Sequence, residues 1–161
     1  MAWRLPKGLP RALAVMTIAA GIYSVVASSA AAQGPECRGA AATITGTSGP
    51  DQIAGTSARD VIVARGGDDQ IRGLGGNDLI CAGRGSDQVQ GGRGRDHLFG
   101  GRGADQIKGN PGDDRLFGQR SNDELQGNDG DDVLRGGRRT DLGLGGSGLD
   151  ACFNVEFSVS C

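Results

Sequence analysis

A nine-residue repeat that runs without insertion or deletion constrains this chain more than any other feature. Counted from Gly46, twelve consecutive units place Asp at their sixth position, and chance does not put so many aspartates in register. Repeat units of this kind stack on one another, because one unit alone cannot bury its apolar side chain. The twelve aspartates are Asp51, Asp60, Asp69, Asp78, Asp87, Asp96, Asp105, Asp114, Asp123, Asp132, Asp141 and Asp150.

The first and eighth positions of each unit are also regular. Gly makes up 31 of the 161 residues without the collagen period of three, so the glycines serve fixed places in the repeat. Position one is Gly in ten units and Ala in the other two, at Ala64 and Ala82. Position eight is large and aliphatic as far as Leu134, and it then fails at Gly143 and Cys152. One aliphatic side chain per unit predicts a thin core.

These units resemble the nonapeptide G-G-x-G-x-D-x-U-x of the hemolysin-type calcium-binding (RTX) family, in which U is a large aliphatic residue. The resemblance extends from Gly46 to Phe153. It implies an all-β fold, a right-handed parallel β-roll with two nonapeptide repeats per coil turn. Each unit would be a glycine loop followed by a short strand, with U facing inward and its two neighbours facing outward.

Two units per turn would stack aspartates that are 18 residues apart, with Asp51 beginning one stack and Asp60 the other. Neighbours in a stack would lie roughly 4.8 Å apart, the usual spacing of strands. Carboxylates this close repel one another unless a cation lies between them, and an oxygen-lined site of about six ligands suits Ca²⁺ better than Mg²⁺. All twelve aspartates are therefore candidate calcium ligands, joined by the loop carbonyls that the resemblance implies. The alternative is that Asp only forms turns with Gly.

The loops are not expected to bind calcium equally well. Three of them lack Gly at the fourth position and carry Ala58, Ser121 and Arg139 instead. Pairs of loops that avoid these residues leave seven predicted sites, three on the edge of Asp51 and four on the edge of Asp60. Because the core is thin and stacked carboxylates repel, we expect the chain to be largely disordered without calcium and to fold when Ca²⁺ binds.

The N-terminal 32 residues differ from the repeats. Arg4, Lys7 and Arg11 precede an apolar run over 12–32, a pattern typical of a cleaved secretory signal peptide, with an uncleaved membrane anchor as the alternative. Cleavage would take the formal net charge from −2 to −5 and leave no membrane span. So acidic a chain is a poor partner for nucleic acid. The predicted parts are the signal peptide (1–32), an N-terminal cap (33–45), the β-roll (46–153) and a C-terminal cap (154–161).

Four cysteines follow the predicted signal peptide, and an even number in a secreted chain predicts two disulfides. The repeat places Cys81 on the outside of the second sheet, where Cys37 could reach it. Cys152 lies in the last unit, and Cys161 follows nine residues later. We therefore expect the pairs Cys37–Cys81 and Cys152–Cys161, each fastening one end of the roll. Free thiols that bind zinc are the alternative.

The outward positions of the second sheet are apolar, whereas those of the first sheet carry glutamines. An exposed apolar patch usually marks a partner site, here for a protein or a cell surface. We nevertheless expect a terminal tail, or self-association, to cover this face, with a dedicated partner as the alternative. The residues of this predicted partner face are Val61, Val63, Leu79, Phe99, Phe117 and Val133.

Enzyme chemistry finds little support in this sequence. The chain has one histidine, His97, at an outward strand position, and no nucleophile–base set or metalloprotease motif accompanies it. The sequence therefore predicts a secreted calcium-binding protein rather than an enzyme. Two alternatives remain, an extracellular adhesion or partner-binding module that uses the apolar face and an accessory part of an exported hydrolase.

Overall fold

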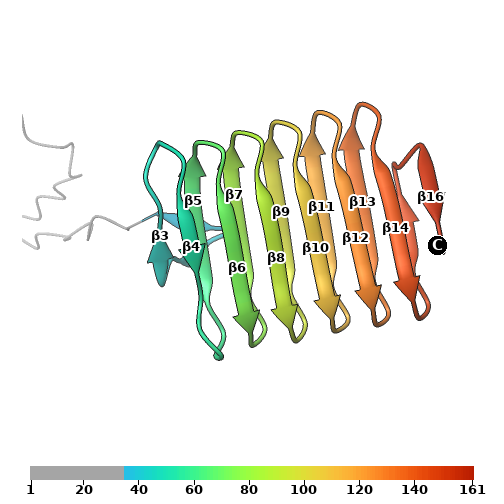
Figure 1. Cartoon of the computed structure of the whole chain (residues 1–161), viewed down its shortest axis with the longest axis horizontal. Coiled ribbons are helices and arrows are strands. Elements are labelled where there is room, and N and C mark those ends of the chain that lie inside the picture. The colour runs from blue at the N-terminus through green and yellow to red at the C-terminus, as the bar shows by residue number, and fades with distance from the viewer. Residues whose placement is uncertain (1–34) are drawn as a thin grey trace, which may run out of the picture. The chain divides into compact units, whose positions relative to one another are not determined.

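The computed structural model describes residues 35–161, so the predicted signal peptide lies outside the described residues. Within this range every regular element is a β-strand, and fourteen of the sixteen strands form two seven-stranded sheets. Figure 1 shows that the strands follow one another along a single axis in sequence order, alternating between the two sheets. The described residues contain no helix that is long and apolar enough to span a membrane.

The two sheets take alternate strands of the chain. The polar sheet, named for its outward glutamines, consists of β4 (Gln52–Ala54), β6 (Gln70–Gly75), β8 (Gln88–Arg93), β10 (Gln106–Pro111), β12 (Glu124–Asp129), β14 (Leu142–Ser147) and β16 (Phe157–Val159). The apolar sheet consists of β3 (Ile44–Thr45), β5 (Val61–Gly66), β7 (Leu79–Arg84), β9 (His97–Arg102), β11 (Arg115–Arg120), β13 (Val133–Arg138) and β15 (Ala151–Phe153).

Strand pairing follows the repeat. Gln52 pairs with Gln70 and Ile62 pairs with Ile80, each 18 residues further on, and all the pairs within both sheets are parallel. Two nonapeptides therefore make one turn of the coil. The predicted all-β parallel β-roll is confirmed, and its arrangement is consistent with right-handed coiling, the usual hand of parallel crossovers.

The core is a single file of aliphatic side chains between the sheets. In β6 the burial alternates, so that Ile71 and Gly73 face inward while Gln70 and Arg72 are exposed. Position eight of one unit and position one of the following unit thus face inward, because successive residues of a strand point to opposite faces of the sheet. The buried eighth-position residues are Ile62, Ile71, Ile80, Val89, Leu98, Ile107, Leu116, Leu125 and Leu134.

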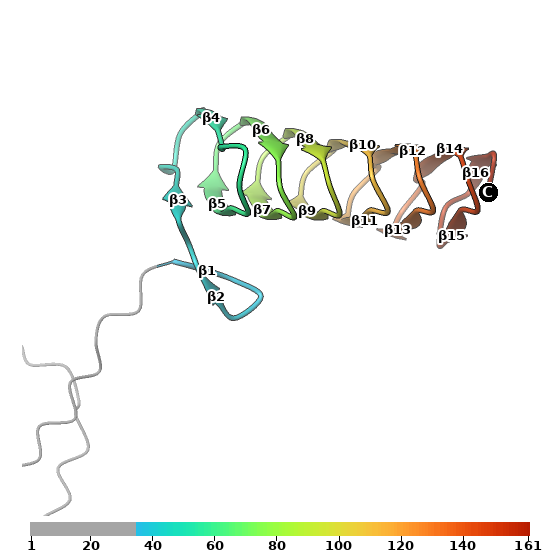
Figure 2. The same ribbon diagram turned by 90° about the horizontal axis from the view of Figure 1, so that it is seen from below.

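A short hairpin covers the N-terminal half of the apolar sheet. Its strands β1 (Glu36–Cys37) and β2 (Ala40–Ala41) pair antiparallel, and Figure 2 shows them beside the roll rather than within it. Cys37 forms the expected disulfide with Cys81, with the two Cα atoms 5.7 Å apart. Ala40 and Ala42 pack with Cys37 against the outer face of the sheet.

This hairpin supplies the expected cover by a terminal tail and corrects the alternative of an exposed partner face. The side chains of Val61, Val63 and Phe99 are only 5%, 8% and 8% exposed. Leu79 and Phe117 are partly buried in the same cluster, and Val133 is partly exposed beyond it. Tail cover therefore accounts for much of this face, because burying these side chains removes apolar surface from water.

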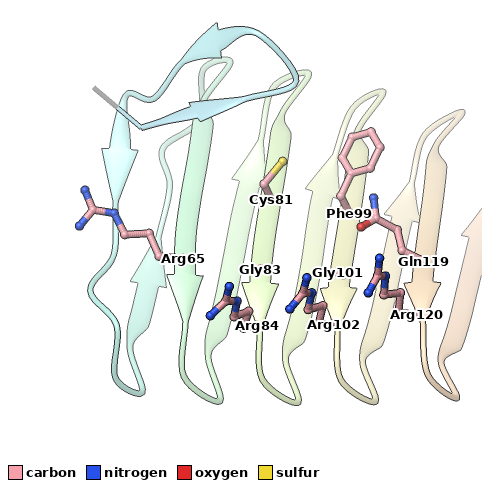
Figure 3. A pocket seen from close by; sticks show the side chains of 10 residues that line it. Arg65, Cys81, Gly83, Arg84, Phe99, Gly101, Arg102, Gln119 and Arg120 are labelled. Carbon is pink, nitrogen blue, oxygen red and sulfur yellow. The ribbon is translucent and has the colours of Figure 1, made fainter. Parts of the chain in front are cut away.

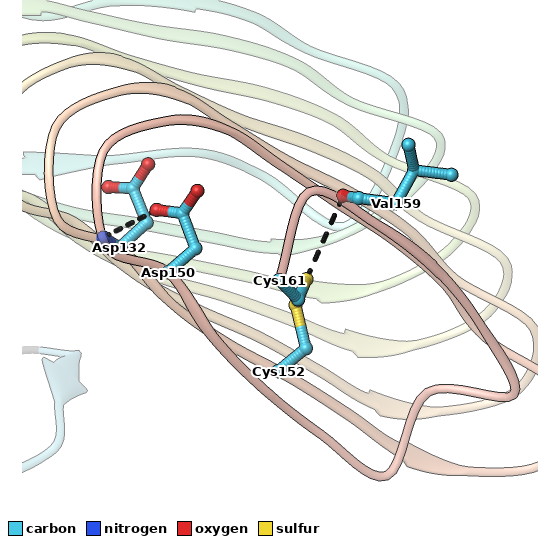
Figure 4. The surroundings of a disulfide bond; sticks show 5 residues. All are labelled: Asp132, Asp150, Cys152, Val159 and Cys161. Carbon is cyan, nitrogen blue, oxygen red and sulfur yellow. Dashed lines mark hydrogen bonds between the residues drawn. A yellow bond between two sulfur atoms is a disulfide. The ribbon is translucent and has the colours of Figure 1, made fainter.

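The C-terminal end of the roll departs from the period of nine. Leu142 pairs with Phe157, only 15 residues on, because the last loop is shorter than the others. The side chain of Val155 fills the space that Gly143 leaves in the core, with Cγ1 3.2 Å from the point that a Cβ on Gly143 would occupy. The disulfide Cys152–Cys161, expected from the sequence, closes this end beside the last aspartates of the repeat (Figure 4).

Candidate metal sites

The aspartates of the repeat lie inside the turns that join the two sheets. Those that start with Asp51 form the first edge of the roll, and those that start with Asp60 form the second edge. Ten of the twelve are buried, with 0% to 6% of each residue exposed, and the remaining two, Asp51 and Asp150, are partly buried at the ends. Burial of this many carboxyl groups in register requires partners for their oxygens.

One oxygen of each carboxyl group has a backbone partner. The N–H of Asp78 donates to Oδ1 of Asp96 at 2.8 Å, and the N–H of Asp96 donates in turn to Oδ1 of Asp114 at 2.8 Å. The same bond recurs every 18 residues on both edges, from Asp51 and Asp60 onward. These bonds link each loop to the next one on its edge, so the aspartates form two continuous ladders.

The second oxygen is buried without any partner in ten of the aspartates. A buried polar atom without a hydrogen bond costs roughly 1–3 kcal/mol, and more if it is charged. The single ion pair among residues 35–161, between Arg95 and Asp113 at 2.6 Å, is exposed and does not involve these groups. The orphaned atoms are Oδ2 of Asp69, Asp78, Asp87, Asp96, Asp105, Asp114, Asp123, Asp132, Asp141 and Asp150.

Burial changes the protonation of the ladders. It raises the pKa of the central aspartates Asp105 and Asp114, and the carboxylates above and below raise it further, although the backbone hydrogen bond opposes the shift. Without a cation, the ladders would therefore resist full ionisation near neutral pH. The pKa rises to about 6 for Asp87, Asp96 and Asp132, and to about 7 for Asp105, Asp114 and Asp123.

The first-position glycines show where the free oxygens point. A Cβ added to Gly73 would collide with Oδ2 of Asp78 and with the carbonyl oxygen of Gly91, one turn further along. Gly91 faces Asp96 in the same way. Carboxylate and carbonyl oxygens therefore converge beside each of these glycines. Residues 35–161 contain no cluster of three or more His, Cys, Asp or Glu side chains, so a bound ion would take its other ligands from the backbone. Such a set of hard oxygens fits Ca²⁺.

Comparison with known protein families agrees with this geometry. A family model described as the RTX calcium-binding nonapeptide repeat, in four copies, matches residues 45–80, 82–116 and 108–142. The chain belongs to this RTX family. No curated protein matches the sequence.

The two edges of the RTX roll differ at the first position of the repeat. On the second edge this position is glycine in every unit from Gly55 to Gly145. On the first edge, Ala64 and Ala82 stand there, and both are fully buried. Both alanines belong to the core cluster, and they stand at the repeat position where a Cβ would meet the aspartate in the glycine units. A cation on the first edge therefore has less room beside these two aspartates.

The fourth position of the RTX repeat requires a left-handed backbone in most loops. Gly112 and Gly130 have φ of 147° and 132°, in the region that favours glycine. Ser121 and Arg139, which the sequence marks as doubtful, keep positive φ values of 84° and 88°. Their loops thus hold the common shape at a cost in strain. Ala58 is not among the residues with positive φ, so its loop has a different shape.

The first two RTX loops satisfy their aspartates without a metal. The N–H of Thr47 donates to Oδ2 of Asp51 at 2.7 Å, and the N–H of Thr56 donates to Oδ2 of Asp60 at 2.7 Å. The Thr56 hydroxyl adds a bond of 3.0 Å to the same oxygen of Asp60. Sequence reasoning missed these caps, although threonine at the second position occurs only in these two units.

A glutamate ends the ladder on the first edge. The N–H of Asp141 donates to Oε2 of Glu156 at 2.6 Å, in place of the aspartate that a further unit would supply. The period of nine does not point to Glu156, because this residue lies three positions short of the sixth position of a further unit. The longer side chain and the shortened last loop together bring its carboxyl group to the end of the stack.

Proposed function

We propose that this RTX protein binds several Ca²⁺ ions between stacked loops and folds around them after secretion. The observation that carries the proposal is the column of buried Oδ2 atoms without partners, which recurs on both edges from Asp69 and Asp78 onward beside backbone carbonyl oxygens. Calcium would supply the charge that these oxygens lack. Its flexible coordination accepts two carboxylates with several carbonyls, whereas Mg²⁺ demands a stricter octahedron.

The second edge supports the strongest sites. Its loops from Asp78 to Asp150 have glycine at both the first and the fourth positions, and their free oxygens all lack partners. We therefore assign four ions to the gaps between successive aspartates of this stretch, each held by two carboxyl groups and the adjoining carbonyls. On the first edge every gap touches at least one departure from the repeat, so calcium binds there more weakly. The departures are Thr47, Ala64, Ala82, Ser121 and Arg139.

Folding and metal binding are coupled in this proposal. The core is one side chain wide, and the metal-free ladders bury carboxyl groups that would be ionised in the unfolded chain. A ligand that binds only the folded state stabilises it by mass action. Extracellular calcium modules have dissociation constants of roughly 10⁻⁴–10⁻³ M. The chain would thus fold only where calcium is plentiful, as it is outside the cell.

Secretion rests on two features. The basic and apolar N-terminus is typical of a signal peptide, and both pairs of cysteines form disulfides, which persist in oxidising compartments. The alternative of an adhesion module on the apolar sheet loses support, since the hairpin buries much of that face. No feature of the described residues favours an accessory part of a hydrolase.

The test is a calcium titration of the mature chain, starting in chelator, with its disulfides intact. Far-ultraviolet circular dichroism should show a cooperative rise of β-structure as Ca²⁺ reaches the millimolar range. Magnesium at the same concentrations is the control and should produce far less signal. A chain that is fully folded in excess chelator, and that does not change on adding calcium, would refute the proposal.

A further inference from the structure

A row of arginines runs along the apolar sheet where its strands enter the loops of the first edge. Four successive strands of this sheet end in arginine, and the strand pairing places each arginine directly beside the next. They are Arg84 of β7, Arg102 of β9, Arg120 of β11 and Arg138 of β13. All four are exposed. Adjacent members are therefore separated by about one strand spacing, roughly 4.8 Å.

None of the four arginines of this row forms an ion pair. The only ion pair of residues 35–161 is Arg95–Asp113, on the second edge. Beside the arginines the exposed first-edge loop residues Ser86, Ala104, Asn122 and Thr140 are neutral, and Arg139 adds a further positive charge after Arg138. The exposed carboxylate nearest the row along this edge is Asp68, which accepts a hydrogen bond from the N–H of Ser86 at 2.8 Å. Like charges placed directly opposite on neighbouring strands destabilise a sheet. A row of four therefore carries a standing repulsion that an external anion would relieve.

The second edge, built from the same repeat, shows the contrast. At the corresponding strand ends of the polar sheet stand Arg93 and Asp129, together with residues that carry no charge. Its loops carry Arg95 and Asp113 in an ion pair. Both signs of charge are thus interspersed there, as on an ordinary solvated surface. The arginine row is a property of one edge and not of the nonapeptide itself.

The groove beside the row shows what kind of anion fits. In Figure 3, Arg84, Arg102 and Arg120 lie in line along the open groove, with Gly83 and Gly101 next to them. Guanidinium groups bind carboxylate, sulfate and phosphate oxygens through two parallel hydrogen bonds. A rigid row with an even spacing complements a linear polymer that carries one such group on each repeating unit.

The aromatic residues argue against a nucleic acid as this polymer. Single-stranded nucleic acids need exposed aromatic rings on which bases can stack. Phe99, which lines the groove, is 8% exposed. Its ring already stacks on Phe117, with the centroids 4.6 Å apart, and the guanidinium of Arg38 lies 5.0 Å from its centroid. The groove offers charge without a stacking platform.

We propose that the arginine row binds a linear acidic polysaccharide, through one carboxylate or sulfate group for each arginine. This inference rests on the proposed function in one respect, because the row exists only in the folded roll. By linkage, a polymer that binds the folded roll must also lower the calcium concentration needed for folding. Calcium loading would in turn make the acidic chain less repulsive to a polyanion.

The experiment measures binding to dextran sulfate, carboxymethyl dextran and neutral dextran, in millimolar calcium, by fluorescence anisotropy of the labelled polymers. We expect both acidic dextrans or one of them to bind, and neutral dextran not to bind. The preferred polymer identifies the oxyanion. Replacement of Arg84, Arg102 and Arg120 by Gln should weaken binding by more than about tenfold, since three ion pairs are lost together.

A matched triple variant provides the control. Arg59→Gln, Arg72→Gln and Arg93→Gln remove the same charge from exposed positions outside the row, and should weaken binding by less than about threefold. Equal losses in the two triple variants, no binding to either acidic dextran, or equally tight binding of single-stranded poly-dT would overturn the inference. The calcium titration of circular dichroism is read on the same samples. Normal calcium-driven folding without polymer binding refutes the arginine row alone, whereas calcium-indifferent folding refutes only the proposed function.

Discussion

The two edges of the roll come from one repeat, yet they treat their aspartates differently. Each edge has five aspartates whose Oδ2 lacks a partner, but only the second edge, from Asp78 to Asp150, keeps glycine at both critical positions throughout. The first edge begins with a threonine-capped aspartate, continues past two buried alanines, and ends on a glutamate. Both edges share the nonapeptide period that builds the coil. The glycines that leave room for a cation are best preserved on the second edge.

The largest expected difference comes from removing the carboxylates themselves. Asp96→Asn with Asp114→Asn disrupts three of the four calcium sites assigned to the second edge. The calcium concentration at the midpoint of folding should rise by more than about tenfold, because the loss of a residue that only contacts a metal ligand already lowers metal affinity by about that factor. Asp69→Asn with Asp87→Asn on the first edge should raise the midpoint much less. Circular dichroism titrations measure both. Equal shifts would mean that the edges do not differ in calcium affinity.

Exchanging glycine and alanine at the first position of the repeat should make the calcium affinity of one edge more like that of the other. Gly91→Ala places a methyl group against Oδ2 of Asp96, in a backbone that needs no left-handed φ, and should weaken calcium binding. Ala82→Gly opens the same space beside Asp87 and should strengthen it, despite the entropic cost of glycine. Titration calorimetry gives the number and affinity of the sites. A lower affinity in both variants would contradict the steric account.

Acid should partly replace calcium. The folded-state pKa of the central aspartates lies above the value of about 3.9 in an unfolded chain, reaching about 7 for Asp105 and Asp114. The folded state therefore binds more protons, and its stability without metal falls as the pH rises from about 4 to about 7. In chelator, the β-signal at about pH 5 should exceed that at about pH 8. A signal that grows with pH would contradict the buried, orphaned carboxyls.

The smallest effect concerns the threonine caps. Thr56→Val keeps the side-chain shape but removes the hydroxyl that donates to Asp60 and accepts from the N–H of Ala58, and should destabilise the calcium-loaded protein by about 1 kcal/mol. The calcium stoichiometry should not change, since this loop satisfies its aspartate internally. Urea unfolding at saturating calcium measures the loss. A change in the number of bound ions would show that the capped loop is a metal site after all.

The period of the sequence was enough to predict the coil. Twelve aspartates in register, with one aliphatic residue each, predicted two units per turn and the inward eighth position, which Ile71 and Leu98 confirm. Placing each cysteine in that repeat also led to the disulfides Cys37–Cys81 and Cys152–Cys161 that the structure contains. These features follow from the period of nine and from the place of each cysteine relative to it, both of which a sequence displays directly.

Other features depend on contacts that the period does not encode. Glu156 and Val155 take over repeat positions only because the last loop is short, so neither stands in register. The hairpin covers Phe99 because a segment outside the repeat folds back on the apolar sheet. Ser121 and Arg139 adopt positive φ because the flanking turns impose it, against their own preference.

The location of the ions tests the central claim most directly. Crystals of the mature chain grown with calcium can be measured by anomalous diffraction, which reveals bound calcium independently of the refined protein. We expect peaks between successive loops of the second edge, beside Oδ2 of Asp78, Asp96 and Asp114, with weaker peaks on the first edge. An ordered aspartate ladder without any peak at these oxygens would show that its carboxyl groups are structural, and the calcium-driven account of folding would be wrong.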